Sequence, residues 1–284
     1  MKKLLTLILT GILALTACVG LTACKPQGQT GGGDKIVDVT TKTVTVGYTV
    51  YSPMNYTDDT GIFTGFDTEL ALRVFNALGY DVRFREIDWA NKYLELNEET
   101  VDCVWNGFTR NSTDKDVNGN TVARDELADF SLDYMENGQV LICKSNKAIT
   151  DLSQLAGKSL AYETKSAADS LINGDDSMFK GININKAGLP YQKDAAEQVM
   201  TGAKDYAVID MILAKDLIKN NAAYSDVVIC DIDLGLEYYA IAFKKESALT
   251  AKVNTILKAF AEVGYLEELA TKYGLENAVI TSWN

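Results

Sequence analysis

The stretch from residue 65 to residue 79 reads Gly65-Phe66-Asp67-Thr68-Glu69-Leu70-Ala71-Leu72-Arg73-Val74-Phe75-Asn76-Ala77-Leu78-Gly79. Its apolar residues recur at the spacing that places them on one face of an α-helix. These residues are Phe66, Leu70, Val74, Phe75 and Leu78. A glycine just after the last apolar residue is typical of a helix end. The stretch therefore predicts a helix that stops at Gly79.

The chain on either side of this helix alternates between short apolar strands and further helices. Strands are predicted at 43–48, 82–86, 101–105, 139–144, 158–162, 206–209, 227–230 and 238–243. Helices are predicted at 166–172, 195–201, 211–220, 248–263 and 265–272. Such alternation is typical of an α/β protein, and 284 residues suffice for two lobes.

Charge and composition exclude several classes of function. The chain has 39 Asp and Glu against 27 Lys and Arg, a net charge of −12. Proteins that bind nucleic acid need the opposite balance, so we expect no nucleic acid partner. Histidine is absent. Its absence excludes Ser-His-Asp and Cys-His catalysis, and zinc or haem bound through histidine.

The N-terminus has the form of a secretory signal sequence. A basic Met1-Lys2-Lys3 precedes an apolar, uncharged run at 4–17, which is typical of a signal peptide. The sequence Leu-Thr-Ala-Cys occurs twice, ending at Cys18 and Cys24, and resembles the bacterial lipobox, whose cysteine is diacylated.

Cys24 is the favoured lipidation site because a polar tether begins directly after it, whereas Cys18 gives the more usual apolar length. Two acyl chains suffice for stable anchoring. We expect a signal peptide at 1–23, a tether at 24–42 and a body on the extracellular face of the membrane. An uncleaved span at 4–23 is the alternative, and it too puts the body outside the cytoplasm.

Three further cysteines lie in apolar, strand-like runs: Cys103, Cys143 and Cys230. Their odd number argues against a complete disulfide framework. We expect buried free thiols, with a single Cys143–Cys230 bridge left open.

Several motifs together resemble one family. In chain order they are Tyr51-Ser52-Pro53, the stretch at 65–71 with Leu78-Gly79, the run at 102–109, Asp129-Phe130-Ser131, the run at 152–158 and the helix start at 264–269. Each is weak alone, but their order and spacing are similar to the family 3 extracellular solute-binding proteins, the polar amino acid receptors of ABC importers. The resemblance spans residues 43–275.

The resemblance implies a type II periplasmic-binding-protein fold, with two lobes that close around a ligand by a hinge motion. Lobe 1 would comprise 43–135 plus 236–284, and lobe 2 would comprise 139–232. Two strands near 134–138 and 233–237 would form the hinge. We expect a monomer whose partners are a free amino acid, an ABC transporter permease and the membrane.

A free amino acid carries a carboxylate and an ammonium, and burying both requires partners of opposite charge. The resemblance implies such partners. Arg124 would bind the carboxylate, with the helix start at Ser166 and Ala167, and Asp210 would bind the ammonium. The full set of expected ligand-binding residues is Tyr51, Trp89, Asn106, Gly107, Thr109, Arg124, Ser166, Ala167 and Asp210.

Alternatives stay open at several of these positions. Arg124 follows residues 106–109 less closely than in the family, so Arg110 is the alternative cation. Asp210 could cap the helix that follows it, and Ser166 with Asp169 could be a plain helix cap. Glu163 could pair with a cationic ligand side chain.

The residues between these two arginines form a polar, turn-rich insertion at 114–121. It fits the first half of a calcium-binding EF-hand loop, but position twelve is Asp125 rather than glutamate. We expect a surface insertion, no metal and no cofactor.

A binding receptor that performs no reaction is the function the sequence favours. The alternatives are an enzyme on the same fold, similar to cyclohexadienyl or arogenate dehydratase and using Glu163 or Glu237, and a sensing module that serves a membrane receptor.

Overall fold

Strands and helices alternate through the computed structural model, which describes residues 42–283. The first elements are β1 (Lys42–Tyr48), β2 (Tyr56–Thr57), β3 (Phe63–Thr64), α1 (Phe66–Ala77), β4 (Tyr80–Glu86), η1 (Trp89–Asn91), α2 (Lys92–Asn97), β5 (Cys103–Thr109), β6 (Thr113–Lys115), β7 (Thr121–Ala123), α3 (Arg124–Leu127) and β8 (Asp129–Phe130). They are followed by β9 (Met135–Lys144), η2 (Ser145–Lys147), η3 (Leu152–Leu155), β10 (Ser159–Glu163), α4 (Ala167–Asn173), β11 (Asn185–Leu189), α5 (Gln192–Met200), β12 (Tyr206–Asp210), α6 (Met211–Asn220), η4 (Ala222–Tyr224), β13 (Val227–Ile229), β14 (Leu236–Phe243), α7 (Ala248–Glu262) and α8 (Tyr265–Tyr273). The η segments are short 3-10 helices.

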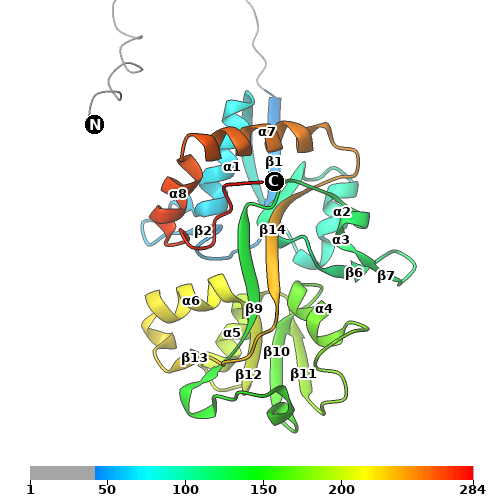
Figure 1. Cartoon of the computed structure of the whole chain (residues 1–284), viewed down its shortest axis with the longest axis vertical. Coiled ribbons are helices and arrows are strands. Elements are labelled where there is room, and N and C mark those ends of the chain that lie inside the picture. The colour runs from blue at the N-terminus through cyan, green and yellow to red at the C-terminus, as the bar shows by residue number, and fades with distance from the viewer. Residues whose placement is uncertain (1–41, 284) are drawn as a thin grey trace, which may run out of the picture. The chain divides into compact units, whose positions relative to one another are not determined.

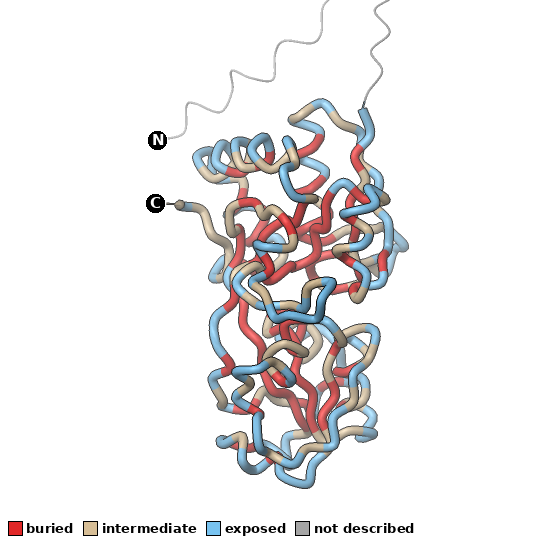
Figure 2. Tube along the Cα trace, turned by 90° about the vertical axis from the view of Figure 1, so that its right-hand side faces the viewer, coloured by how far each residue is buried: buried red, intermediate tan, exposed pale blue. Residues whose placement is uncertain are grey.

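The main sheet is shared between two α/β lobes (Figure 1). Its strand order is β11-β10-β12-β9-β14-β5-β1-β4, with β13 beside β9 and β8 beside β14. In lobe 1, drawn uppermost, β1 pairs in parallel with β4 and β5. In lobe 2, β10 pairs in parallel with β11 and β12. Buried segments follow the strands through both lobes (Figure 2), and the largest cluster of buried apolar residues extends from lobe 1 into lobe 2.

Two antiparallel strands carry the chain between the lobes. β9 and β14 pair along Met135–Gly138 and Leu236–Tyr239. Beyond this crossing β9 pairs with β12 in lobe 2, and β14 pairs with β5 in lobe 1. Each strand therefore belongs to the crossing at one end and to a lobe at the other. The lobes are joined by a continuous ladder of backbone hydrogen bonds.

The second crossing strand begins later than the sequence predicts. It starts at Leu236 rather than at Asp233. The Asp233 side chain accepts a hydrogen bond from the Gly235 N–H (2.9 Å), and Gly235 has a φ of 97°. This turn precedes the strand.

β5 is longer than predicted, and this changes the account of the site. The sequence predicts a strand that ends at Trp105 and a loop after it, but β5 continues to Thr109. Its pairing with β14 shifts register between Ala240 and Ala242, and Gly107 has a φ of 57°. The bulge lets the strand continue while it changes the direction of the residues near Gly107.

α1 confirms the helix predicted from the opening stretch, and Asp67 ties its start to β5. Asp67 is fully buried and accepts hydrogen bonds from the Gly107 N–H (2.8 Å) and the Tyr134 hydroxyl (2.9 Å). Burial raises the pKa of Asp67 to about 7. The helix that orders the core of lobe 1 is thus also fastened to the bulged end of β5.

Cys103, Cys143 and Cys230 are buried free thiols, as predicted. The sulfurs of Cys143 and Cys230 lie 3.5 Å apart, in contact but without a bridge.

None of the helices within residues 42–283 is both long and apolar enough to cross a membrane. The predicted signal peptide, Cys18, Cys24, the alternative span at 4–23 and the tether up to residue 41 lie outside the described residues.

Gly65→Ala tests how the opening stretch is held. Gly65 has a φ of 125°, and an added Cβ would lie 2.2 Å from the Met54 carbonyl oxygen. We expect the free energy of unfolding, measured with denaturant, to fall by about 3 kcal/mol or more, because backbone strain and a clash combine. Gly61→Ala is the matched control. Its φ is 83° with nothing within 4 Å, so the loss should be near 1 kcal/mol. Equal losses would contradict the role assigned to the Met54 contact.

Candidate functional site

A pocket lies between the lobes, where several strands end. Lobe 1 lines it with Thr49, Trp89, Asn106, Gly107, Thr109 and Arg124. The crossing strand β9 and lobe 2 add Gln139, Glu163, Ser166, Ala167, Ala168, Gln192, Val208, Ile209 and Asp210. The carboxyl ends of strands in α/β sheets are common ligand sites. Of the expected ligand-binding residues, only Tyr51 is missing from the lining.

Arg124 is the buried cation of the pocket, and part of its guanidinium has no partner. Its Nη1 donates to the Thr109 carbonyl (2.8 Å), and its Nε lies 3.1 Å from Asp114 Oδ2. Nε and Nη2 are both buried, and neither has a hydrogen-bond partner among residues 42–283, so the contact of Nε with Asp114 is an ion pair only. An unpaired buried donor is costly, so Nη2 is available to donate a hydrogen bond to an anionic ligand group.

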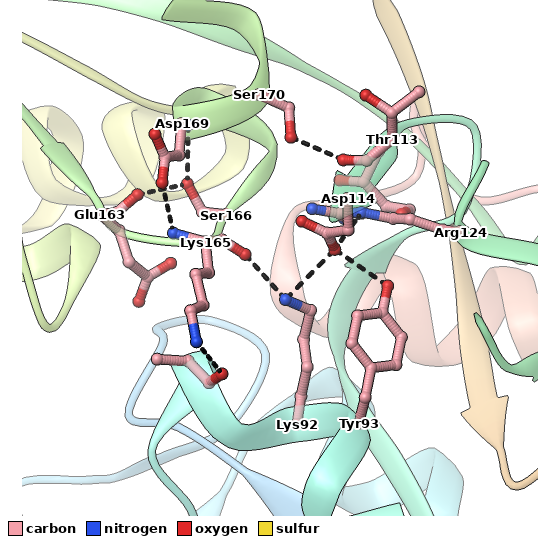
Figure 3. A network of polar contacts seen from close by, with 12 residues as sticks. Lys92, Tyr93, Thr113, Asp114, Arg124, Glu163, Lys165, Ser166, Asp169 and Ser170 are labelled. Carbon is pink, nitrogen blue, oxygen red and sulfur yellow. Dashed lines mark hydrogen bonds and ion pairs between the residues drawn. The ribbon is translucent and has the colours of Figure 1, made fainter. Parts of the chain in front are cut away.

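The acidic partner of Arg124 comes from the insertion between the two arginines (Figure 3). Residues of this insertion form the β6–β7 hairpin, which carries Asp114. The Asp114 carboxylate also lies 3.3 Å from the Lys92 Nζ and accepts a hydrogen bond from the Tyr93 hydroxyl (2.9 Å). Burial would lower the pKa of Arg124, but Asp114 and other acidic neighbours raise it above its ordinary value. The guanidinium therefore stays charged.

The alternative cation, Arg110, lies outside the pocket lining. Its Nε and Nη2 each lie 2.7 Å from the Asp133 carboxylate, in a bidentate pair. Such a pair occupies two N–H donors of the Arg110 guanidinium.

Asp210 provides the opposite charge from lobe 2. Its carboxylate accepts hydrogen bonds from Gln192 (2.8 Å), Asn137 (3.2 Å) and Gln139. Glu237 lies beside it and shares both of the amides on β9. Burial raises the pKa of Asp210, and burial together with the charge of Asp210 raises that of Glu237 to about 7. Asp210 also occupies the N-cap position of α6 but makes no side-chain cap bond there.

Glu163 is a second lobe 2 carboxyl in the pocket. It ends β10 and is almost fully buried. Burial, and then the charge of Asp210, raises its pKa to about 8. Ser166 follows as the N-cap of α4, where its hydroxyl donates to the Glu163 carbonyl (2.8 Å) and accepts from the Asp169 N–H (3.3 Å). The capping alternative for Ser166 is therefore real, although Ser166 and Ala167 also line the pocket.

Some expected ligand groups already have partners inside the protein. The Asn106 amide donates to the Thr49 carbonyl (2.8 Å) and to Asn55 (2.8 Å), and the Gly107 N–H donates to Asp67. Tyr51 lies behind Gly107, and its hydroxyl is 2.8 Å from that of Tyr239. These groups shape the wall of the pocket.

Trp89 is the aromatic wall that faces the pocket. Its ring packs against Phe108 with centroids 4.9 Å apart. The Lys92 ammonium lies 5.4 Å from the Trp89 centroid. An aromatic face of this kind can pack on apolar stems or on cations.

Several lining residues were missed in the sequence. Gln192 begins α5, and Gln139 lies on the crossing strand, in segments without a distinctive motif. Lys92 lies outside the lining but contacts Asp114, and it too was not predicted, because a lysine in a short helix is typically a surface residue.

The calcium alternative for the insertion finds no support. Asp114 is used by Arg124 and Lys92, and Asp116 caps the hairpin turn by accepting from the Asn118 and Asn120 N–H groups (2.8 Å each). Across the described part of the chain, no cluster of His, Cys, Asp or Glu has the arrangement of a metal site.

Residues 44–276 match the family described as bacterial extracellular solute-binding proteins, family 3. The chain belongs to this family. This solute-binding protein is 28% identical to the arginine-binding extracellular protein ArtP of Bacillus subtilis (strain 168), over 92% of this chain and 96% of that protein.

A solved structure has the same fold as this solute-binding protein. It is an ABC uptake transporter substrate-binding protein from Streptococcus pneumoniae with bound histidine, 28% identical, with a TM-score of 0.71 over 81% of this chain and 92% of that one. The type II fold implied by the resemblance is therefore confirmed. A more distant relative is an enzyme, the cyclohexadienyl dehydratase of Pseudomonas aeruginosa, 23% identical over 70% of each chain.

The buried carboxyl groups predict a stability that depends on pH. Asp67, Glu163 and Glu237 have folded-state pKa values of about 7, 8 and 7, against ordinary values of 3.8, 4.5 and 4.5. Between these limits the folded state keeps protons that the unfolded chain has lost. The free energy of unfolding of the ligand-free protein should therefore fall from pH 5 to pH 8, by about 1.4 kcal/mol per pH unit for each extra bound proton.

Lys92 acts in the opposite sense. Burial lowers its pKa to about 8, so its buried charge ceases to cost stability above that pH and the fall should level off. Denaturant titrations at several pH values measure the slope. Glu163→Gln should flatten it between pH 7 and pH 8, and a stability that rises from pH 5 to pH 8 would contradict the assignment.

Proposed function

We propose that this protein is an extracellular receptor that binds a free polar amino acid between its lobes and delivers it to an ABC transporter permease by lobe closure. One observation carries the proposal. Arg124, whose Nη2 has no hydrogen-bond partner within residues 42–283, and the acid Asp210 line one pocket from opposite lobes. A zwitterion has two charges that would satisfy both.

The ligand carboxylate would bind the Arg124 guanidinium, whose planar fork suits a carboxylate better than a lysine ammonium does. The start of α4, at Ser166 and Ala167, borders the same space. The ligand ammonium would bind Asp210, whose amide partners hold the carboxylate in place. Each ligand charge thus gains a protein partner in place of the water that it loses on burial.

The ligand side chain would lie between Trp89 and Glu163. With Arg124 and Asp210 taken by the zwitterion, Glu163 is the charged lining residue left over. Its raised pKa means that it stays protonated until a cation comes near. We therefore propose a preference for a cationic amino acid, consistent with the arginine-binding name of the Bacillus relative.

The proposed receptor catalyses no reaction. The dehydratase alternative rests on the buried carboxyl groups of Glu163 and Glu237, which hold protons near neutral pH and so could act as general acids. Incubation of purified protein with arogenate or prephenate separates the two functions, because only the enzyme would form product.

We also propose the placement of the chain in the cell and its division into lobes. The predicted signal peptide at 1–23, lipidation at Cys24, and tether would leave lobe 1 at 43–135 plus 236–284, and lobe 2 at 139–232. Lipid anchoring would hold a monomeric receptor beside its permease. A role as the sensing module of a membrane receptor would need another partner, and co-purification with either membrane protein distinguishes the two.

A thermal shift screen against the twenty amino acids tests the receptor function. A ligand at 100 times its Kd stabilises the folded state by about 2.7 kcal/mol, which corresponds to about 5–10 °C in Tm. Arg124→Ala and Asp210→Ala should each abolish the shift. Arg110→Ala is the control and should keep it, because Arg110 pairs with Asp133 outside the pocket. Full ligand response in both pocket variants would refute the proposed binding mode.

Glu163→Gln tests the preference for a cationic side chain. By calorimetry the variant should lose at least tenfold in affinity for L-arginine or L-lysine and much less for L-glutamine, because only a cation pairs with the ionised carboxylate. Wild-type affinity for L-arginine should also rise from pH 6 to pH 8 as Glu163 loses its proton, and the variant should keep only the part of this dependence that comes from Asp210 and Glu237, whose pKa values are also raised. Equal losses for all three amino acids would show that Glu163 supports the pocket without reading the side chain.

A further inference from the structure

The β6–β7 hairpin of lobe 1 lies against α4 of lobe 2 (Figure 1). The Ser170 hydroxyl, on α4, donates to the Thr113 carbonyl (2.6 Å). The Thr121 hydroxyl, on the hairpin, donates to Asp175 (2.7 Å), just past α4. Lys115 lies 3.5 Å from the same carboxylate. The hairpin thus bonds to lobe 2 at two places.

The inner side of the same hairpin reaches the pocket through Asp114. This carboxylate is about nine-tenths buried and lies between two cations, Arg124 Nε at 3.1 Å and Lys92 Nζ at 3.3 Å. Lys92 in turn donates to the Lys165 carbonyl (2.7 Å), directly before α4. A second bond returns across the cleft, from the Lys165 Nζ to the Ala90 carbonyl (3.2 Å). Figure 3 shows these residues converging.

We propose that the β6–β7 hairpin is the closure latch of the receptor, and that Asp114 is a positioning residue that aligns Arg124 for the ligand carboxylate. This inference rests on the proposed function, because it concerns the same pocket. It adds to the proposed function a hairpin that joins the two lobes at a place other than the crossing strands.

The alignment follows from the donors of Arg124. The Thr109 carbonyl accepts from Nη1 (2.8 Å), and the Asp114 carboxylate holds the guanidinium by charge, as an ion pair with Oδ2 3.1 Å from Nε. Neither Nε nor Nη2 has a hydrogen-bond partner among the described residues, which leaves Nη2 for the ligand. Two cations share one carboxylate, so a net positive charge remains for the ligand. Loss of Asp114 would leave two buried cations to repel each other.

The latch follows from where its bonds lie. Ser170–Thr113, Thr121–Asp175 and Lys92–Lys165 each join one lobe to the other, so they exist only while the lobes are closed. Contacts made only in the closed state lower the rates of lobe opening and ligand release. They leave the association rate unchanged, because the ligand enters the open receptor. The hairpin should therefore act on the dissociation rate.

The latch is tested with the double variant Ser170→Ala/Asp175→Ala, whose positions lie at the surface of lobe 2. The probe is L-arginine, or whichever of the twenty amino acids gives the largest thermal shift, and stopped-flow tryptophan fluorescence follows binding. We expect release about tenfold faster, since two hydrogen bonds across the cleft are lost, with association within twofold of wild type. Asp176→Ala, one residue further on, is the control and should match wild type.

The positioning role is tested with Asp114→Asn. We expect affinity about 100-fold weaker for every amino acid that binds, since the α-carboxylate is common to all. Asp114→Glu should restore part of the loss, because the charge returns. Asp125→Asn, next to Arg124 but exposed, is the control. Affinity is measured for the folded, active fraction, so that a variant which merely folds less well keeps the wild-type Kd.

Release rates within twofold of wild type in the double variant, or an unchanged Kd in Asp114→Asn, would overturn the hairpin proposal while the proposed function stands. Absence of binding by the wild-type protein to any amino acid of the panel would overturn both.

Discussion

The antiparallel pairing of β9 with β14 holds the two lobes together. Both strands leave the crossing to become part of a lobe sheet, so the two lobes meet at one fixed register. The crossing also supplies the floor of the pocket. Asn137 and Gln139 project from β9 and hydrogen-bond to Asp210 from lobe 2 and Glu237 from β14. A change in register by one residue would turn these amides to the other face of the sheet.

The cleft has cationic residues on one side and acidic residues on the other, and the proposed ligand would bind to both. On one side Arg124 and Lys92 share Asp114, and on the other are the buried acids Asp210, Glu237 and Glu163. Asp210 and Glu237 accept hydrogen bonds from side-chain amides, and none of the three acids forms an ion pair within residues 42–283. Burial favours the neutral form of these acids, so their raised pKa values express a missing positive partner. A zwitterion, with its two ends apart, fits such a separated pair of sites.

Much of this could be predicted from the sequence, and the exceptions have physical reasons. The helix at 66–78 is predictable because its apolar residues recur with a strong helical period. The hydrogen bond from the Gly107 N–H to Asp67 is not predictable, because the two residues are far apart in the chain. Gly107 sits in a bulge of β5, and a bulge depends on the neighbouring strand rather than on local residue preference. The hairpin at 113–123 was predicted only as a surface insertion, because nothing in a polar, turn-rich segment says which side chain turns inward.

The α/β alternation and the lack of histidine chemistry could be read from the sequence, because they follow from residue type and periodicity along the chain. The family, and with it many of the residues that line the cleft, came from the resemblance of several motifs to known solute-binding proteins. Only the folded structure shows that Arg124 lines the pocket, whereas Arg110 pairs with Asp133 outside it. It also shows that Asn106 and Gly107 donate their hydrogen bonds within lobe 1, and that Lys92 and Asp114 are buried together. These are contacts between segments far apart in the chain, and a charged side chain becomes part of a site only when folding removes its water and leaves a partner within reach.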